Sequence, residues 1–177
     1  MKRVVTYLLI ISIFCNGNCR KNKIESNGLP PATQEGKNTL GFLLNGETWE
    51  PKGSNGTANL SIDFDPGFNN GILGIAAYRI ITSNNREYFG IGIKENLNTY
   101  NAPATFSLSN SGLFRLRFEN NGCSYFSTDA DTNVSGSLTL TKLDRTNHII
   151  SGTFNASVSK TGCETINITE GRFDMKY

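Results

Sequence analysis

Alternation of apolar and polar positions is the dominant pattern along the chain from residue 38 onward. Residues 60–64, 114–119 and 150–158 each place apolar side chains at every second position, and the first run ends at Asp65-Pro66-Gly67. A period of two, interrupted by turn residues, is typical of antiparallel strands that bury one face. We therefore expect a series of short strands and almost no helix.

Two of the predicted strands depart from simple alternation. Residues 72–81 are almost entirely apolar on both faces, which favours a place in the middle of a sheet or between two layers. Residues 88–94 alternate large apolar residues with Gly90 and Gly92. Two glycines on one face leave room close to the strand. We expect side chains of a neighbouring strand to fill that room, with a bound ligand as the alternative.

The last predicted strand changes its parity. Its apolar residues are even-numbered at Ile166 and Ile168 but odd-numbered at Phe173 and Met175. One residue must therefore be looped out between these pairs, and we expect a β-bulge near Glu170-Gly171. Beyond the bulge, Arg172 and Asp174 are expected on the outer face as an exposed pair worth under about 1 kcal/mol.

The runs add up to about nine or ten strands, enough for an antiparallel β-sandwich or a closed β-barrel. Alternation does not choose between these two all-β architectures, because both have inward and outward residues. Asn45-Gly46 lies between two short runs. This dipeptide predicts a two-residue hairpin turn with positive φ at both positions.

The N-terminal residues have the pattern of a secretory signal. Lys2 and Arg3 precede an apolar run at residues 4–14. The run is too short to cross a membrane, which takes about 20 apolar residues. A cysteine at the cleavage site is what a bacterial lipoprotein signal requires. We predict a lipoprotein signal peptide at residues 1–18 with the lipid on Cys19, or alternatively on Cys15; cleavage to a soluble secreted protein is the other possibility.

Residues 19–37 are rich in Asn, Lys, Glu and Pro, and we expect them to form a flexible tether to a single β domain at residues 38–177. The formal net charge of +2 comes from the signal: without Lys2 and Arg3, fifteen basic side chains face fifteen acidic ones. A neutral mature chain has no field to attract nucleic acid, so we expect no nucleic-acid partner.

Cleavage would leave Cys123 and Cys163 as a pair in an oxidising compartment, which predicts a disulfide. Closing a loop of about 40 residues would stabilise the fold by roughly 4 kcal/mol in the chain-entropy model. Two cysteines do not complete a tetrahedral shell, and the chain has one histidine, His148, so we expect no metal site.

The sequence carries few signs of catalysis. A Ser-His-Asp machine would have to use His148, and neither a Gly-x-Ser-x-Gly elbow nor a phosphate-binding glycine loop occurs. We predict no enzyme activity and no cofactor. Asp63 and Asp65 would lie on one strand face about 7 Å apart, as a carboxylate pair could, but their sequence context favours a strand end and turn.

Residues 129–133, Asp-Ala-Asp-Thr-Asn, begin like a calcium loop with oxygen ligands at alternating positions. The pattern then fails, because Val134 stands where the turn needs glycine and Leu140 where a glutamate should close the shell. We expect an Asp-rich surface turn, with an adventitious Ca²⁺ site as the alternative.

Four stretches resemble a family of small Bacteroidota lipoproteins of unknown function. They are Leu-Pro-Pro-Ala-Thr-Gln at 29–34, Leu-Asn-Gly-Glu-Thr-Trp at 44–49, Ile-Ser-Gly-Thr-Phe at 150–154 and Ile-Thr-Glu-Gly-Arg-Phe-Asp at 168–174. The resemblance implies a protein held in the cell envelope by a lipid, on the periplasmic face or the cell surface. It also implies one β-rich domain without an assigned activity, and it supplies no catalytic residues.

Three functions remain open at this point. The first is a non-enzymatic module that binds an envelope protein or a glycan through loops or a sheet face. The second is a lipocalin-like carrier that holds a small apolar ligand among Phe89, Ile91, Phe114, Leu116 and Phe154. The third is a hydrolase that uses carboxylates, for which the candidates are Asp63, Asp65, Asp129 and Asp131.

Overall fold

The computed structural model describes residues 27–54, 56–82, 85–120 and 122–177. The predicted signal peptide, Cys15 and Cys19 lie outside these residues. Within them, no helix is long and apolar enough to cross a membrane.

The described residues form eleven strands and one 3₁₀ turn, η1 (Leu97–Thr99). The strands are β1 (Thr39–Leu44), β2 (Glu47–Trp49), β3 (Leu60–Asp65), β4 (Ile72–Thr82), β5 (Asn85–Ile93), β6 (Ala104–Ser107), β7 (Phe114–Asn120), β8 (Cys123–Phe126), β9 (Thr132–Asp144), β10 (Ile149–Lys160) and β11 (Ile166–Lys176). The all-β prediction is confirmed, although the predicted nine or ten strands fall short of the eleven observed.

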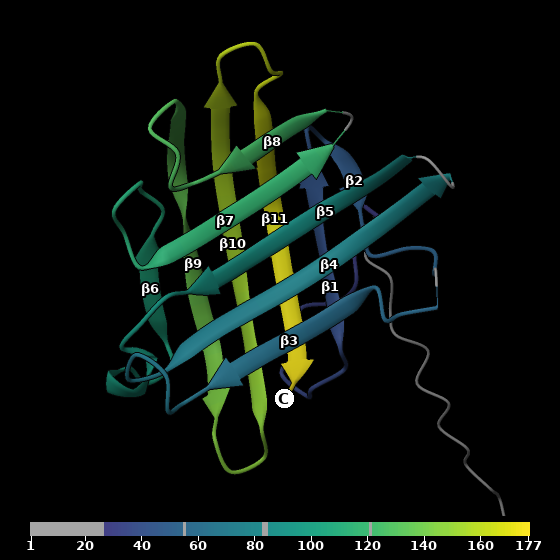
Figure 1. The fold of residues 1–177 in the computed structure, drawn as a ribbon. Helices are drawn as coiled ribbons and strands as arrows, with labels where there is room; N and C mark the ends of the chain where they lie inside the picture. Colours follow the sequence, from purple (N-terminus) through teal and green to yellow (C-terminus); the bar gives the residue numbers. More distant parts are fainter. Residues whose placement is uncertain (1–26, 55, 83–84, 121) are drawn as a thin grey trace, which may run out of the picture.

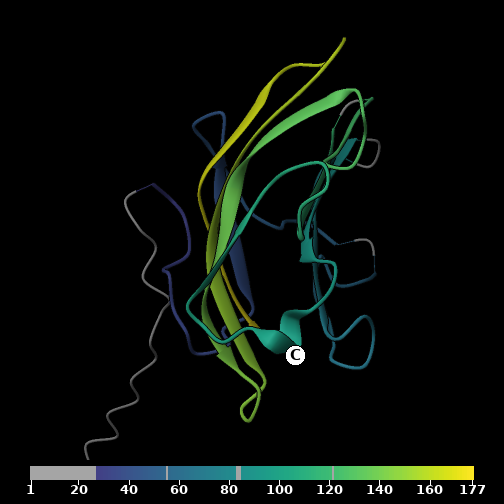
Figure 2. The ribbon, with the colours of Figure 1, turned by 90° about the vertical axis from the view of Figure 1, so that its left-hand side faces the viewer.

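The strands form two separate antiparallel sheets, so the architecture is a β-sandwich and not a closed barrel. The six-stranded sheet has the order β2-β1-β11-β10-β9-β6, and the five-stranded sheet has the order β3-β4-β5-β7-β8. Figure 1 shows the five-stranded sheet running diagonally across the six-stranded one. The edge-on view in Figure 2 separates the two layers.

The inner faces meet in an aromatic core. Phe89 of β5 packs against Phe42 of β1 and Phe154 of β10, with ring centroids 4.5 Å and 5.4 Å away. Trp49 of β2 stacks on Phe42 at 4.8 Å. The five residues expected to line a carrier's ligand cavity are instead packed within this core, each at most 4% exposed: Phe89, Ile91, Phe114, Leu116 and Phe154. The interior cavity that a lipocalin-like carrier requires is thus filled by side chains.

The predicted hairpin turn and bulge are both present. Asn45 and Gly46 have φ angles of 50° and 89° and join β1 to β2. In β11, the register shifts between Ile168 and Gly171 against β10 and between Thr169 and Arg172 against β1. The left-handed residue of the bulge is Glu170, at φ 53°, and not the glycine. Gly171 serves close packing, because a Cβ there would lie 2.5 Å from the Phe154 ring.

The prediction of a flexible tether through residue 37 is wrong for its second half. Leu29 is 0% exposed and Pro30 is buried. Both contact β1 at Gly41, where a Cβ would lie 2.7 Å from the Pro30 ring. Figure 2 shows residues 27–37, in purple, along the outer side of the six-stranded sheet. We call this segment the N-terminal strap.

A buried carboxylate holds the strap. Asp174 of β11 is 1% exposed and accepts hydrogen bonds from Thr33 Oγ1 at 2.6 Å and from the backbone N–H groups of residues 35, 36 and 37 at 2.8–3.2 Å. Ser151 Oγ adds a fifth at 2.8 Å. The predicted exposed pair with Arg172 is therefore wrong: Arg172 bonds Glu170 instead. Composition concealed the strap, since its contacts are mainly backbone groups and one distant aspartate.

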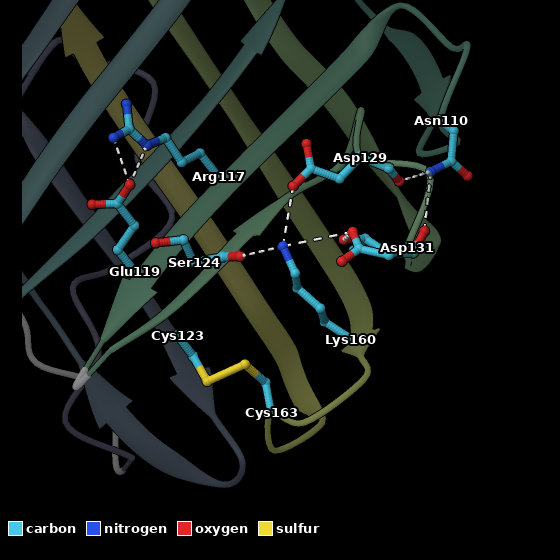
Figure 3. Close-up of polar contacts among 10 residues, drawn as sticks. Asn110, Arg117, Glu119, Cys123, Ser124, Asp129, Asp131, Lys160 and Cys163 are labelled. Atoms are coloured by element: carbon cyan, nitrogen blue, oxygen red, sulfur yellow. Dashed lines mark hydrogen bonds and ion pairs between the residues drawn. A yellow bond between two sulfur atoms is a disulfide. The ribbon is translucent and has the colours of Figure 1, made fainter.

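A disulfide joins the two sheets covalently at the end of the sandwich where β8 begins and β10 ends. The predicted disulfide links Cys123 of β8 to Cys163 in the β10–β11 turn, with Cα atoms 6.0 Å apart. It connects one sheet to the other. Figure 3 shows the bridge beside the Lys160 side chain, which adds an ionic link from β10 to the loop after β8.

Replacing Asp174 with asparagine should destabilise the protein in a pH-dependent way. Burial raises the pKa of Asp174, but hydrogen bonds from Thr33, the strap backbone and Ser151 outweigh burial and leave the pKa below its ordinary value. The carboxylate therefore stabilises the fold above about pH 4, and this contribution is lost as pH falls through the folded-state pKa. We expect Asp174→Asn to lower the free energy of unfolding by about 2–4 kcal/mol at pH 7.

Urea unfolding of both proteins between pH 7 and pH 2 measures this difference. It should shrink at the acid end, where the wild-type group is protonated. A variant as stable as wild type at pH 7, or a difference undiminished at pH 2, would contradict the role given to Asp174.

Removing the disulfide should lower stability without changing the fold. The closed loop spans a sequence separation of 40 residues. In the chain-entropy model, the double variant Cys123→Ser/Cys163→Ser loses about 4 kcal/mol. Urea unfolding with and without reductant checks this: wild type should fall to the level of the variant, and the variant should not respond. Equal midpoints for oxidised and reduced wild type would refute the prediction.

Candidate functional site

The outer face of the five-stranded sheet carries a groove of about 450 Å³. Because Phe89, Ile91 and their neighbours on β4 and β7 point into the core, the alternate residues point outward. On the two central strands of the groove these outward residues are the smallest in the code. They are Gly74 and Ala76 of β4 and Gly90 and Gly92 of β5.

The register of the strands places a charged rim on each side of this floor. One cross-strand row runs Asp63–Gly74–Gly92–Arg115, from β3 to β7. The next runs Ser61–Ala76–Gly90–Arg117 and continues to Phe126 of β8. The floor is thus two strands wide, with oxygen-bearing residues along β3 and guanidinium groups along β7.

The three glycines of the groove floor occupy their positions for different reasons. A Cβ on Gly92 would collide with the Leu73 carbonyl oxygen, and one on Gly90 would lie 2.8 Å from the Tyr88 hydroxyl. Packing therefore explains both. A Cβ on Gly74 would meet only the Asp63 Cβ, at 4.0 Å. Glycine in a strand costs about 0.5–1 kcal/mol, so Gly74 leaves the groove open where a side chain would fit.

Arg117 forms a rigid wall at one end. Its guanidinium carbon lies 4.7 Å from the Tyr88 ring centroid and 4.8 Å from that of Phe126, so it is held between two aromatic rings. Its Nε donates to Glu119 at 2.8 Å. Figure 3 shows this pair. Arg117 is thus neutralised and fixed by its own surroundings.

Tyr88 contributes a neutral phenol to the same wall. Burial raises its pKa, the nearby Arg117 lowers it, and the balance stays above the ordinary value. The hydroxyl remains protonated at neutral pH and is available to donate a hydrogen bond over Gly90.

Arg115 is positioned differently. Its Nη1 donates to the backbone carbonyl of Asn110 at 3.0 Å and that of Ser109 at 3.5 Å. Both acceptors belong to the loop before β7. Among the described residues, no carboxylate lies within ion-pair distance of Arg115. Neutral carbonyl groups therefore hold the Arg115 guanidinium, and no carboxylate of the described residues compensates its charge.

The two carboxylates of β3 have different surroundings. Asp65 accepts the N–H groups of Gly67 at 2.7 Å and Phe68 at 3.1 Å, which confirms the predicted strand end and turn. Asp63 is exposed on the groove rim, and in the part of the chain that the structure describes it has no hydrogen-bond partner.

The acidic turn at residues 129–131 is occupied by a cation from the chain itself. Figure 3 shows Lys160 pointing between Asp129 and Asp131, with Nζ–Oδ distances of 3.2 Å and 3.6 Å. The hydrogen bond to Asp129 is the main cause that raises the Lys160 pKa. The alternative of a Ca²⁺ site is therefore not supported, because an ammonium group already fills the position. No metal-ligand cluster of three or more His, Cys, Asp or Glu exists among the residues that can be described.

The four candidate carboxylates of a hydrolase are not brought together. Asp63 and Asp65 belong to β3 at one edge of the five-stranded sheet, whereas Asp129 and Asp131 follow β8 at the opposite edge. His148 is in the β9–β10 turn, with its ring against Tyr177.

A larger hollow of about 720 Å³ lies at the open end of the sandwich beside β2 and β4. Its Arg79 donates to Glu87 at 2.7 Å and to the Thr48 carbonyl at 3.2 Å. Glu87 also accepts the Trp49 indole N–H at 2.7 Å. These polar groups hydrogen-bond to one another beside the core, so the contacts of this hollow serve the fold.

Sequence reasoning noted the two glycines of β5 and the arginines of β7 but did not join them. Part of the room over the glycines is filled by Tyr88 of the same strand, and not by a neighbouring strand as expected, and the rest is open. The missing information was the register, which aligns Gly74 with Gly92 and both with Arg115. The sequence did contain a signal of the groove: the outward positions within 74–76 and 90–92 are small, and those within 115–117 are arginines.

Comparison with known proteins finds no match for this chain among protein-family models, curated proteins or solved structures. The resemblance to Bacteroidota lipoproteins therefore stays a prediction.

Proposed function

We propose that this protein is a lipid-anchored bacterial envelope protein whose β-sandwich is a non-enzymatic, glycan-binding module. The observation that carries the proposal is the groove on the outer face of the five-stranded sheet. Its floor has almost no side chains, and its two rims carry opposite hydrogen-bonding capacity, with acceptors along β3 and donors along β7.

A saccharide fits this chemistry. Its hydroxyls both donate and accept, so a saccharide can donate to Asp63 on one rim and accept from a guanidinium on the other. Its flat shape suits a floor of glycine and alanine, and the rings of Tyr88 and Phe126 close one end with apolar surface. The volume of the groove falls within the range of about 300–1,000 Å³ typical of small-ligand sites.

An extended peptide fits less well. Peptides that bind β-sheets gain most of their affinity by adding a strand at an open edge. The groove lies on a face, where the backbone groups of β4, β5 and β7 already pair with one another. A peptide would have to rely on side chains alone.

The carboxylates support binding over hydrolysis. Glycoside hydrolysis uses two carboxyl groups about 5–9.5 Å apart across the scissile bond. Here Asp65 is committed to a turn, and Asp129 and Asp131 to Lys160. Asp63 stands on the rim as a recognition group.

The strap supports an anchored arrangement. With residues 27–37 fixed to the six-stranded sheet, the segment from Cys19 to the domain is short, and even fully extended it spans about 30 Å. The strap lies along the outer side of the six-stranded sheet (Figure 2), whereas the groove lies on the outer face of the five-stranded sheet. A protein anchored through Cys19 would hold its groove on the side away from the attached chain. The disulfide between Cys123 and Cys163, within one chain, is compatible with an oxidising envelope.

Filling the groove should abolish glycan binding. Gly74→Leu places a side chain over the floor where a Cβ fits without a clash. We expect full-length protein in mild detergent to bind a subset of an oligosaccharide array. The variant should lose at least tenfold in affinity, with a melting temperature at or above that of wild type. Thr153→Leu, on the exposed outer face of β10, is the matched control. Absence of saccharide binding by wild type, or unchanged binding by Gly74→Leu, would refute the proposal.

The anchor can be tested separately. Bacteria that express the protein should incorporate labelled palmitate into wild type and into Cys15→Ser, but not into Cys19→Ser. Loss of label in Cys15→Ser alone would move the lipid to Cys15. An unlabelled wild type would indicate a secreted protein without an anchor.

A further inference from the structure

Two charges of opposite sign lie on opposite rims of the groove, each without an ion-pair partner among the described residues. Arg117, Arg172 and Lys160 each have a carboxylate partner within the fold. Arg115 and Asp63, at the two ends of one cross-strand row, have no such partner among the residues that the structure describes. The row between them consists of Gly74 and Gly92.

The Arg115 guanidinium is oriented for a carboxylate. Nη1 is used by the carbonyls of Ser109 and Asn110, whereas no hydrogen bond within the described residues uses Nε or Nη2. These two N–H groups form the edge that binds a carboxylate through two parallel hydrogen bonds. Fixing Nη1 in advance reduces the rotamer entropy lost on binding.

The width of the row sets the size of the ligand. Three strand spacings separate Asp63 from Arg115, about 14 Å between Cα atoms. Because side chains stand roughly perpendicular to a sheet, a ligand that contacts both rims must span much of this distance, as a short oligosaccharide does. A ligand that satisfies both rims must carry an acid group on one edge and hydrogen-bond donors on the other.

We infer that the groove recognises an acidic saccharide of the uronic acid class, with the carboxylate on Arg115 and ring hydroxyls donating to Asp63. This inference rests on the proposed glycan-binding function and names its ligand class. A neutral sugar would leave the Arg115 charge unpaired. A small inorganic anion would pair with Arg115 but could not reach Asp63.

A ligand pair that differs only in charge tests the inference. Trigalacturonate and its methyl ester have the same rings, but the ester lacks the carboxylates. Calorimetric titration of full-length wild type should give at least tenfold tighter binding of the acid. Arg115→Gln should lose this preference and bind both ligands with the affinity that wild type has for the ester. Asp63→Asn should weaken both ligands, because the hydroxyl contact is common to them.

Arg172→Gln is the matched control. It makes the same charge change on the other sheet and should leave the preference intact, which separates recognition from general attraction of anions. Melting temperatures of all variants check that the domain stays folded.

The outcomes distinguish the inference from the proposed function. Equal affinity of wild type for acid and ester would overturn the uronic acid assignment and leave glycan binding standing. If wild type binds other saccharides but neither of these two ligands, the uronic acid assignment is likewise overturned and glycan binding still stands. Failure to bind any saccharide would overturn both. Displacement of trigalacturonate by equimolar inorganic phosphate would show that Arg115 is a simple anion site, which also overturns the assignment.

Discussion

The packing of Phe89 against Phe42 and Phe154 fixes the relation between the two sheets, and the rest of the structure depends on it. It joins β5 to β1 and β10 through rings 4.5 Å and 5.4 Å apart. Because side chains alternate along a strand, an inward Phe89 forces Gly90 and Gly92 outward. The same contact that fills the interior therefore creates the groove outside. A sandwich with an interior packed in this way can bind a ligand on its faces and at its edges, but not between its sheets.

The sequence predicted those features that depend on neighbouring residues. Alternation identified the strands, Asn45-Gly46 the hairpin turn, and the change of parity before Phe173 the bulge. The disulfide followed from counting cysteines, once a signal peptide was assumed. Each of these inferences uses only the local chain or a simple pairing, so no knowledge of register is required.

The features that the sequence did not predict depend on distant residues. Asp174 lies more than 130 residues from the strap that it holds, and its exposed appearance in an alternating strand gave no sign of five hydrogen bonds. Lys160 pairs with Asp129 across two sheets, so the acidic turn looked like an open cation site. The groove needs three registers at once, from β3 to β7. Alternation gives the face of each residue but not its neighbours on that face.

The domain holds its charged groups in more than one way. The buried carboxylates are satisfied within the chain, Glu87 by Arg79 and Trp49, and Asp174 by the strap. Such groups are costly to leave unpaired and contribute to the fold when paired. Arg115 is held differently: like the exposed Arg145, it donates to neutral backbone carbonyls, and one edge of its guanidinium stays free.

The hydrogen bonds of Arg115 hold the loop before β7, but the fold makes no use of its Nε and Nη2 edge. Gly74 likewise lacks a packing reason to be glycine, and a β-branched residue there would strengthen the strand. Both residues belong to one cross-strand row, opposite Asp63. Two departures from what the fold requires, aligned in the same row, are more simply explained by a ligand than by folding. The recognition chemistry that we propose would therefore lie where the sandwich is least optimised for its own stability.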